Sequence, residues 1–403
     1  MNKNKLGSNF TRLWASSGIS SLGDGAMLAA GPLLVASRTQ QPALVAGAVF
    51  AQQLPWLLFS LLSGVFVDRF DRKKILVFAN IVRAIAVGGL ALAIVVNQAS
   101  IPIIYALLFL LGTADTLAEN AAVAFLPEIV TEAQLSSANS HLQGAVLIGR
   151  QLIGPSLGAY LFVVAAAIPF GLDAATFVVA ALLIGLIRKS TKPITSYDRK
   201  TIHNEIREGV QWLWRSEFLR TLAISIAVLS ITFTAAFATF VLFANQRLGL
   251  GPVGYGLMLS LSALGGLFGA VLATPLQSKF SVSTLLRAGL ITEALINLAF
   301  ANVQSPWAAG FIYAIFGMHA VIWGIVTVSL RQKMIPSNLL GRVNSVYNLF
   351  RMGGVAIGAL AGGLIAQAYG ITAPFWVAGI SVALLTILTW RSFGKSKIAA
   401  YML

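Results

Sequence analysis

The chain has 403 residues, of which 57% are hydrophobic and only 10% are charged, and its formal net charge is +15. A soluble domain carries about 25% charged residues, and a globular core stops growing beyond roughly 250–300 residues. This composition therefore excludes a soluble fold and indicates that lipid is the solvent for most of the chain. The basic excess is interpreted as a topology signal and not as a nucleic-acid surface. The sequence contains no cysteine, which excludes disulfides and cysteine-based metal sites.

Twelve apolar segments follow one another along the chain, each long enough to cross a bilayer as a helix of about 20 residues. They are too long, too continuous and too little alternating for strands, so the predicted fold is an all-α integral membrane protein. The first segment is longer than the apolar core of a signal peptide, so we expect it to be retained. The predicted spans are residues 12–36, 43–67, 74–97, 101–124, 138–162, 167–188, 219–244, 253–276, 284–302, 306–330, 342–367 and 371–391.

Lysine and arginine concentrate in alternate loops, namely those after spans two, six, eight and ten, and at the C-terminus. The loops on the other side hold only Arg38 and Arg247. Because basic loops stay in the cytoplasm, both termini are expected there. The loop after span four is an exception, since it carries Glu128 and Glu132 but no basic residue.

A long polar stretch between spans six and seven divides the chain into two groups of six spans. Within it, apolar residues from Ile202 to Leu213 recur at helical spacing. This spacing predicts a short amphipathic helix on the inner membrane surface, or simply a tether between the two groups. The predicted domains are an N-terminal six-helix bundle (1–188), a cytoplasmic linker (189–217) and a C-terminal six-helix bundle (218–403).

The two groups of spans match each other when the chain is shifted by 205 residues. Asn139 and Ser140 then coincide with Asn344 and Ser345. A parallel duplication of a six-helix unit is the organisation of two-half secondary transporters, so the two bundles are expected to be pseudo-symmetric. Four glycine pairs also coincide: Gly64 with Gly269, Gly112 with Gly317, Gly149 with Gly354, and Gly158 with Gly363.

The loop between spans two and three carries the most specific motif. Its glycine is expected to permit close helix approach, and Asp68 to accept hydrogen bonds from Arg72 or to cap a helix N-terminus. Such a cluster stabilises one conformational state and is broken in another; the alternative is an ordinary positive-inside signal. In the second half Ala273 replaces the aspartate. The motif residues are Gly64, Asp68, Arg69, Asp71, Arg72 and Lys73.

This loop resembles the signature loop of the major facilitator superfamily. Asp71, where most members have glycine, resembles the third drug:proton antiporter group, which includes macrolide-efflux and enterobactin-exporter-like proteins. Residues 126–130, 138–140 and 341–343 fit the same group, and the resemblance covers essentially the whole chain. It implies two six-helix bundles, a central cavity, alternating access and a bacterial cytoplasmic (inner) membrane, but no particular substrate.

Span five contains Gly149, Gly154, Pro155 and Gly158. This series is similar to the antiporter motif of the family, although Arg150 stands where the family usually has glycine. The small residues are expected to allow tight packing between the two halves and the proline to allow a bend. The alternative is ordinary small-residue packing.

Charged residues inside the predicted spans each need a reason, because a charge at mid-bilayer costs at least about 2.5–3.5 kcal/mol. In the family layout, spans one, four, seven and ten line the cavity. Asp24, Asp115 and Glu119 are therefore the candidates for carrying the coupling proton, since a low dielectric favours the neutral form of an acid. Alternatively, Asp24 forms a fixed ion pair with an arginine. The ion-pair candidates are Arg83, Arg150 and Arg351.

Span seven carries Phe233, Phe237 and Phe240 along one helical stripe. On the family layout this stripe could face the cavity and hold an apolar or cationic substrate, or it could face lipid. His319 and Trp323 on span ten are further candidates for lining the cavity. The alternative for His319 is a polar residue satisfied within the bundle.

The leading functional hypothesis is proton-coupled efflux of a lipophilic small molecule of the drug, macrolide or siderophore type, by alternating access. The expected energy source is the proton gradient, without cofactor or metal, and the expected assembly is a monomer in the lipid bilayer. Uptake or lipid flipping by the same fold is an alternative, and a non-transporting sensor is a more distant one. An enzyme is excluded because the sequence lacks a metal cluster, a nucleophile–base pair and a phosphate-binding loop.

Overall fold

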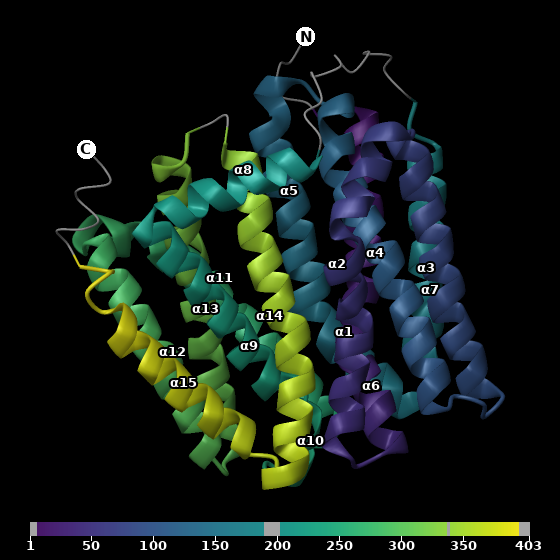
Figure 1. Cartoon of the computed structure of the whole chain (residues 1–403). Coiled ribbons are helices and arrows are strands. Elements are labelled where there is room, and N and C mark those ends of the chain that lie inside the picture. The colour runs from purple at the N-terminus through teal and green to yellow at the C-terminus, as the bar shows by residue number, and fades with distance from the viewer. Residues whose placement is uncertain (1–5, 189–201, 337–338, 395–403) are drawn as a thin grey trace. The chain divides into compact units, whose positions relative to one another are not determined.

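The computed structural model describes residues 6–188, 202–336 and 339–394. These residues form helices and no strand, which confirms the all-α prediction (Figure 1). Eleven helical segments among them are long and apolar enough to cross a membrane, and α15 (Ala373–Thr389) is a shorter apolar helix at the position of the twelfth predicted span.

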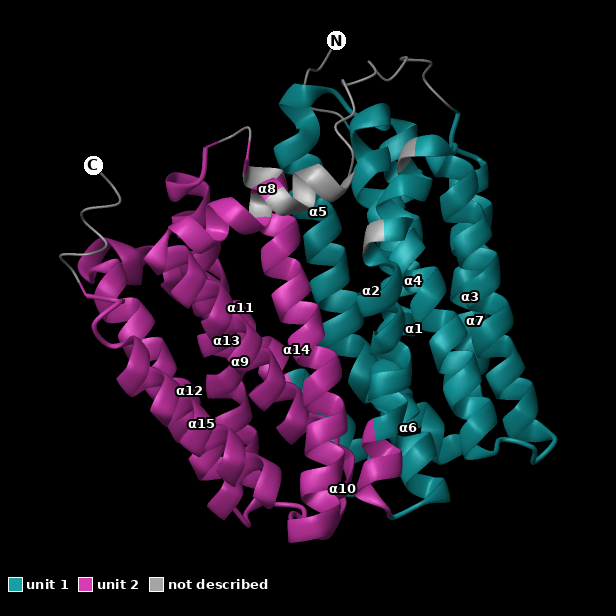
Figure 2. Ribbon diagram, viewed as in Figure 1, with its two compact units in different colours: residues 1–40, 47–194, 250–260 teal, residues 41–46, 195–249, 261–403 magenta. Residues whose placement is uncertain are grey.

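Two compact units make up the chain (Figure 2). Unit 1 comprises residues 1–40, 47–194 and 250–260. Its helices are α1 (Ser8–Arg38), most of α2 (Pro42–Arg69), α3 (Arg72–Val95), α4 (Ile101–Ile129), α5 (Leu135–Val146), η2 (Leu147–Ile153), α6 (Gly154–Val164), α7 (Ile168–Gly185) and the first part of α11 (Pro252–Lys279), with a short 3₁₀ turn, η1 (Glu132–Gln134), before α5.

Unit 2 comprises residues 41–46, 195–249 and 261–403. The predicted boundaries at the linker 189–217 stay a prediction, and residues 189–201 lie outside the described ranges. The helices of unit 2 are α8 (Ile202–Arg215), α9 (Glu217–Phe237), α10 (Phe240–Gln246), most of α11 (Pro252–Lys279), α12 (Val282–Asn302), α13 (Pro306–Met334), α14 (Leu340–Tyr369) and α15.

The short helix predicted in the linker is present as α8. Its Leu213 is 1% exposed and belongs to the apolar core of unit 2. Trp214 stacks on Phe350 of α14 with ring centroids 5.9 Å apart, and Glu208 pairs with Arg342 of α14 at 2.7 Å. The helix is therefore docked on its own unit by apolar and ionic contacts.

Span five departs from a regular α-helix, because its middle, η2, is a π-helix. Residues five apart lie about 140° apart around an α-helix at 3.6 residues per turn, but they stack in a π-helix, whose hydrogen bonds join residues five apart. The N–H of Gly154 donates such a bond to the carbonyl of Gly149. The π segment therefore places Gly149 and Gly154 on one face.

That face packs on α1, within unit 1. A Cβ added at Gly154 would lie 2.7 Å from the backbone carbonyl carbon of Gly25, and one at Gly158 would lie 2.6 Å from that of Ala26. These glycines bring span five against span one, and their expected packing between the two halves stays a prediction. Pro155 touches α11 within unit 1, since a Cβ at Gly256 would lie 2.7 Å from its carbonyl oxygen.

The internal repeat reappears in these contacts. In unit 1, a Cβ added at Gly149 would lie 3.0 Å from the backbone nitrogen of Leu22, and in unit 2 one at Gly354 would lie 2.7 Å from the carbonyl oxygen of Ala227. Gly149 and Gly354 are 205 residues apart, and so are their neighbours Leu22 and Ala227. The close approach of span five to span one is thus repeated between spans eleven and seven.

Gly64 of the loop motif and its equivalent in the second half, Gly269, differ in how closely other helices approach them. A Cβ at Gly269 would lie 2.5 Å from the carbonyl oxygen of Met318, so α11 approaches α13 closely there. At Gly64, by contrast, no atom of the described residues lies within 4 Å of an added Cβ. The expectation that Gly64 permits close helix approach is therefore wrong for this conformation.

We expect Gly158→Ala to destabilise the protein by about 1–3 kcal/mol, because the new methyl group has to separate α6 from the backbone of α1. Thermal unfolding of the purified protein in detergent measures the effect. Gly171→Ala on α7 is the matched control, since an added Cβ meets nothing within 4 Å among the described residues. Equal effects of the two variants would contradict the packing described for α6.

Candidate functional site

The signature loop links three helices of unit 1. The Asp71 side chain caps α3 by accepting hydrogen bonds from the N–H groups of Lys73 (2.9 Å) and Lys74 (3.3 Å). The Lys73 ammonium donates to the carbonyl of Ile187, just after α7, at 2.8 Å. A cation at a helix C-terminus satisfies carbonyls that lack an intrahelical donor, so the loop joins α3 to the end of α7.

Arg72 pairs with Glu128 at the end of α4, where Nη1 lies 2.8 Å from Oε1, and it also donates to the carbonyl of Ala124 at 3.1 Å. The partner expected for Arg72 was Asp68, whose side chain lies outside the described residues. This pair accounts for the acidic loop after span four, because Glu128 is the counter-ion of a motif arginine. Arg69, at the end of α2, is exposed.

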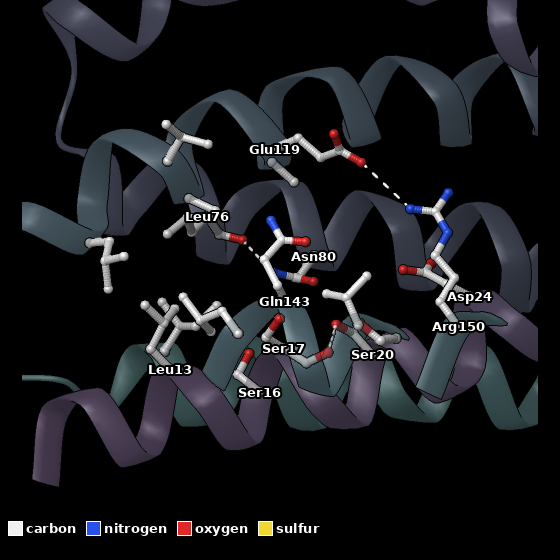
Figure 3. Close-up of a pocket in the computed structure, with 18 of the residues that line it drawn as sticks. Leu13, Ser16, Ser17, Ser20, Asp24, Leu76, Asn80, Glu119, Gln143 and Arg150 are labelled. Atoms are coloured by element: carbon white, nitrogen blue, oxygen red, sulfur yellow. Dashed lines mark hydrogen bonds and ion pairs between the residues drawn. The ribbon is translucent and has the colours of Figure 1, made fainter. Parts of the chain in front are cut away.

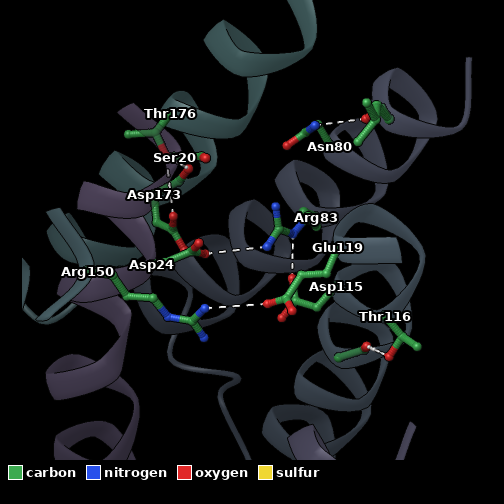
Figure 4. A network of polar contacts seen from close by, with 12 residues as sticks. Ser20, Asp24, Asn80, Arg83, Asp115, Thr116, Glu119, Arg150, Asp173 and Thr176 are labelled. Carbon is green, nitrogen blue, oxygen red and sulfur yellow. Dashed lines mark hydrogen bonds and ion pairs between the residues drawn. The ribbon is translucent and has the colours of Figure 1, made fainter. Parts of the chain in front are cut away.

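Arg83 of α3 holds the centre of unit 1 together (Figure 4). Its Nε donates to Asp115 of α4, and its Nη2 lies 3.7 Å from Oδ1 of Asp24 on α1. Its guanidinium carbon lies 4.4 Å from the ring centroid of Phe177 on α7. The guanidinium is therefore bound from three helices by two carboxylates and an aromatic face.

Arg150 brings the π segment into the same network. Its Nη1 lies 3.6 Å from Oε1 of Glu119 on α4, and both side chains are about half exposed (41% and 53%). Water screens such a pair, so it is more easily broken than the buried pairs of Arg83. The sequence analysis gave Asp24 either a proton-coupling role or an ion pair with an arginine; the structure places Asp24 beside Arg83.

Asp173 of α7 is the residue that the sequence analysis left out. It is fully buried, its Oδ2 has no hydrogen-bond partner among the described residues, and its Oδ1 accepts from Thr176 at 3.3 Å. It packs against Gly23, beside Asp24 (Figure 4). The one available signal was an acid inside an apolar span.

These six residues, here called the charge cluster, contain four carboxyl groups and two guanidinium groups: Asp24, Asp115, Glu119, Asp173, Arg83 and Arg150. With all acids ionised, two negative charges would be uncompensated. Isolated charges are expensive in a low-dielectric interior and are neutralised by proton uptake. The arrangement can therefore bind protons, and Asp173, which lacks an arginine within salt-bridge distance in the described structure, is expected to be neutral.

A cavity of about 350 Å³ adjoins the charge cluster within unit 1 (Figure 3). In Figure 3, Leu13 and Leu76 lie toward one end of the cavity, and Asp24 and Arg150, the latter joined to Glu119, lie toward the other. Hydroxyl and amide side chains lie between them, namely Ser16, Ser17, Ser20, Asn80 and Gln143. Leu126 and Asn139 also line the cavity. The volume suits a small molecule or part of one, and the lining suits an apolar body that carries hydrogen-bonding groups.

The aromatic stripe of span seven is packed into unit 2. Phe240 is 1% exposed, and Phe233 stacks on Phe316 of α13 with centroids 5.0 Å apart. Phe237 stacks on Tyr313 at 5.0 Å. For Phe240, neither the cavity-facing nor the lipid-facing orientation is found, because aromatic residues of the same unit cover it.

His319 and Trp323 are also buried in unit 2, at 9% and 8% exposure. His319 Nε2 lies 3.3 Å from Glu293 Oε2 on α12, and both rings face Gly289 of that helix. The cavity-lining expectation is therefore wrong for both residues in this conformation. Arg351 lies half-buried on α14 of the same unit. In the described parts of the chain, no group of three or more potential metal ligands is found.

A family model described as "Transmembrane secretion effector" matches residues 6–397. The chain belongs to this family of major facilitator transporters. It is 27% identical over 341 residues to the enterobactin exporter EntS of Salmonella typhimurium (strain LT2), which covers 83% of this chain and 80% of the exporter. It is 25% identical over 389 residues to macrolide efflux protein A of Streptococcus pyogenes, which covers 94% of both chains.

The fold is shared with solved transporters. A variant of the nucleoside transporter NupG superposes with a TM-score of 0.78 over 96% of this chain and all of NupG, at 11% sequence identity. As a member of the transmembrane secretion effector family, the chain is a multi-pass membrane transporter and not an enzyme, as its sequence predicts.

We expect Arg83→Gln to destabilise the protein by about 3–5 kcal/mol, because it leaves buried carboxylates without their counter-ion. Adding Asp115→Asn is expected to recover part of this loss, since it removes one of those charges. Thermal unfolding of the single and double variants in detergent measures both effects. The control is Arg342→Gln, which breaks a more exposed pair and is expected to change stability by about 0–1 kcal/mol. Additive losses in the double variant would contradict the coupling.

Asp173→Asn is expected to leave the melting temperature close to that of the wild type, because an amide of the same shape replaces a carboxyl that is already neutral. The same thermal assay checks this. A large loss of stability would instead show that Asp173 is ionised and that its charge is bound by the cluster.

Proposed function

We propose that this transporter exports a lipophilic small molecule across the bacterial cytoplasmic membrane in exchange for protons. The relatives named as an enterobactin exporter and a macrolide efflux protein support the direction and the kind of substrate. Both termini are proposed to lie in the cytoplasm, on the basic side of the predicted topology, and the working unit is proposed to be a monomer. The energy source is the proton gradient, with no cofactor.

The observation that carries proton coupling is the excess of acids in the charge cluster. With Asp173 neutral, three carboxyl groups share two guanidinium groups: Asp24, Asp115 and Glu119 with Arg83 and Arg150. One further proton makes this set neutral. An arginine does not give up its proton, so the exchangeable proton belongs to the carboxyl groups.

Glu119 is the entry point for that proton in our proposal. Its side chain is 53% exposed and lines the cavity, whereas the side chain of Asp115 is 13% exposed and is held by Arg83. A proton that neutralises Glu119 releases Arg150 from its ion pair. Arg150 is then available to a substrate in the same cavity, so proton and substrate compete for one set of charges.

The cavity supports a substrate with an apolar body and several hydrogen-bonding groups. Leucine side chains line one end, serine and amide side chains the middle, and charges the other end. Macrolides and siderophores both combine apolar surface with many oxygen atoms.

The signature loop is proposed to keep unit 1 rigid during alternating access. Arg72–Glu128 and Lys73–Ile187 join the ends of α3, α4 and α7, so unit 1 moves as a body while these contacts hold.

Transport by purified protein in sealed liposomes with an internal pH-sensitive dye tests the proposal. A proton gradient is imposed, and macrolides, siderophores and lipophilic cations are added in turn. We expect proton flux that requires one class of compound. Asp115→Asn and Glu119→Gln are each expected to reduce the coupled flux at least about tenfold, because each removes a group of the exchangeable set.

Glu132→Gln is the matched control for Glu119→Gln, because Glu132 is exposed on η1 and lies outside the charge cluster. It is expected to leave the coupled flux unchanged. Movement of a compound without proton flux in the wild type would refute proton coupling and leave a facilitator. Movement of the compound only toward the compartment that contacts the cytoplasmic face of the protein would refute export.

A further inference from the structure

Unit 2 buries an acid and a histidine against each other. Glu293 on α12 and His319 on α13 are 5% and 9% exposed, and His319 Nε2 lies 3.3 Å from Glu293 Oε2. Asn297, one turn along α12, donates to Glu293 Oε1 at 3.2 Å. Two nitrogen atoms thus face the two oxygens of the carboxyl group, and a proton can be shared between His319 Nε2 and Glu293 Oε2.

The pair joins the same two spans of its unit as the Arg83–Asp115 pair does in unit 1, although at the offset of 205 residues its members are not the equivalents of Arg83 and Asp115. Each joins the third and fourth spans of its own unit: α3 to α4 in one, α12 to α13 in the other. In unit 1 the cation is an arginine, which stays charged at every accessible pH. In unit 2 it is a histidine, whose charge changes in the physiological range. The pair between the third and fourth spans therefore has a titratable cation on the fourth span in unit 2 and a permanent cation on the third span in unit 1.

Charge balance decides how many protons this pair holds. With one proton, a carboxylate and an imidazolium are neutral together. Without it, one negative charge is buried, and with two protons one positive charge is buried; both are unfavourable in a low-dielectric interior. The buried conformation therefore retains one proton, and exposure to water during a conformational change allows its release.

Among the described residues, Glu293 and His319 form an ion pair with each other and with no other charged side chain. In the described residues, α15 carries no charged side chain. Arg287 of α12 donates to the carbonyl of Trp390, and Arg331 of α13 pairs with Asn344 at 2.7 Å. The remaining charged residues of α9, α11, α13 and α14 are Glu217, Arg220, Lys279, Lys333, Arg342 and Arg351.

We infer that Glu293 and His319 form a second proton-binding site, separate from the charge cluster, and that its proton is exchanged during transport. The existence of this site is independent of the proposed function, whereas its exchange during transport rests on that function. The ligand is a proton, held between the imidazole of His319 and the carboxylate of Glu293.

The chain contains only three histidines, so NMR of the whole protein labelled with ¹⁵N-histidine in detergent can observe the site directly. His319→Gln identifies the His319 signal. We expect Glu293→Gln to lower the proton affinity of His319 by about tenfold or more, because it removes the facing negative charge. The signal of His141, which is exposed on α5 and bonded to the carbonyl of Ser137, is expected to keep its midpoint and serves as the internal control.

An unchanged midpoint for His319 in Glu293→Gln would overturn the site. If His319→Gln fails to fold because Glu293 is left unpaired, the double variant Glu293→Gln/His319→Gln restores a neutral pair and still identifies the signal.

Liposome transport then tests exchange. The double variant is expected to bind substrate but to move fewer protons per substrate than the wild type, and an equal ratio would refute exchange. Absence of any coupled proton flux in the wild type would refute the proposed function, while the NMR titration would still decide whether the site exists.

Discussion

The guanidinium of Arg83 is the contact on which the interior of unit 1 depends. It is bound by Asp24, Asp115 and the ring of Phe177, which come from three different helices. Helices in lipid gain little from the hydrophobic effect when they associate, so packing and polar contacts decide their arrangement. A permanent cation surrounded by acids also fixes the electrostatics of the neighbouring cavity. The same guanidinium and carboxyl groups therefore hold the helices of unit 1 together and set the charge available for binding protons.

The two units repeat their packing but not their charges. Gly149 meets Leu22 as Gly354 meets Ala227, with the same offset of 205 residues. The charged groups inside the spans differ: the charge cluster of four acids and two arginines in unit 1, and the pair of Glu293 with His319 in unit 2. A close backbone contact between two helices restricts the residue type, since only glycine fits there. A charged residue inside a span is needed only where the unit uses it, for example to bind a proton. Duplicated units can thus keep one fold while their chemistry diverges.

Much of the fold could be predicted from the sequence, because lipid restricts spanning segments to long apolar helices and basic loops mark their order. The pairing of Asp24 with an arginine was also accessible, since an intramembrane charge needs a partner. The pairing of Arg72 with Glu128 was not, because the partner is 56 residues away and depends on how α3 and α4 pack. Phe240, His319 and Trp323 were assigned to a cavity from the helices that carry them, but the side of a helix that faces its own bundle depends on rotation, which an apolar sequence does not specify.

Asp173 shows a second limit. An acid close to a helix end is easily interpreted as solvated, and only the packing of α7 against Gly23 reveals that it is fully buried. Conversely, the five-residue spacing of Gly149 and Gly154 was visible in the sequence. Residues five apart do not share a face of an α-helix, but they do in a π-helix. The spacing was therefore a signal for the π segment if both glycines face the same neighbouring helix.

A π segment amounts to an α-helix with one residue too many, and so the motif of span five is defined by length as well as by residue type. If the same residues formed a continuous α-helix, everything before the segment would turn by about 100° relative to α6. Gly149 would then leave the face that contacts α1. Substitution scans keep the length of the chain constant and cannot detect such a constraint. In an evolving family, a one-residue deletion between Gly149 and Gly154 would leave the two glycines four residues apart, on one face of a regular α-helix, and would keep the interface with α1. The corresponding stretch of α14, which is regular throughout, has no inserted residue to lose.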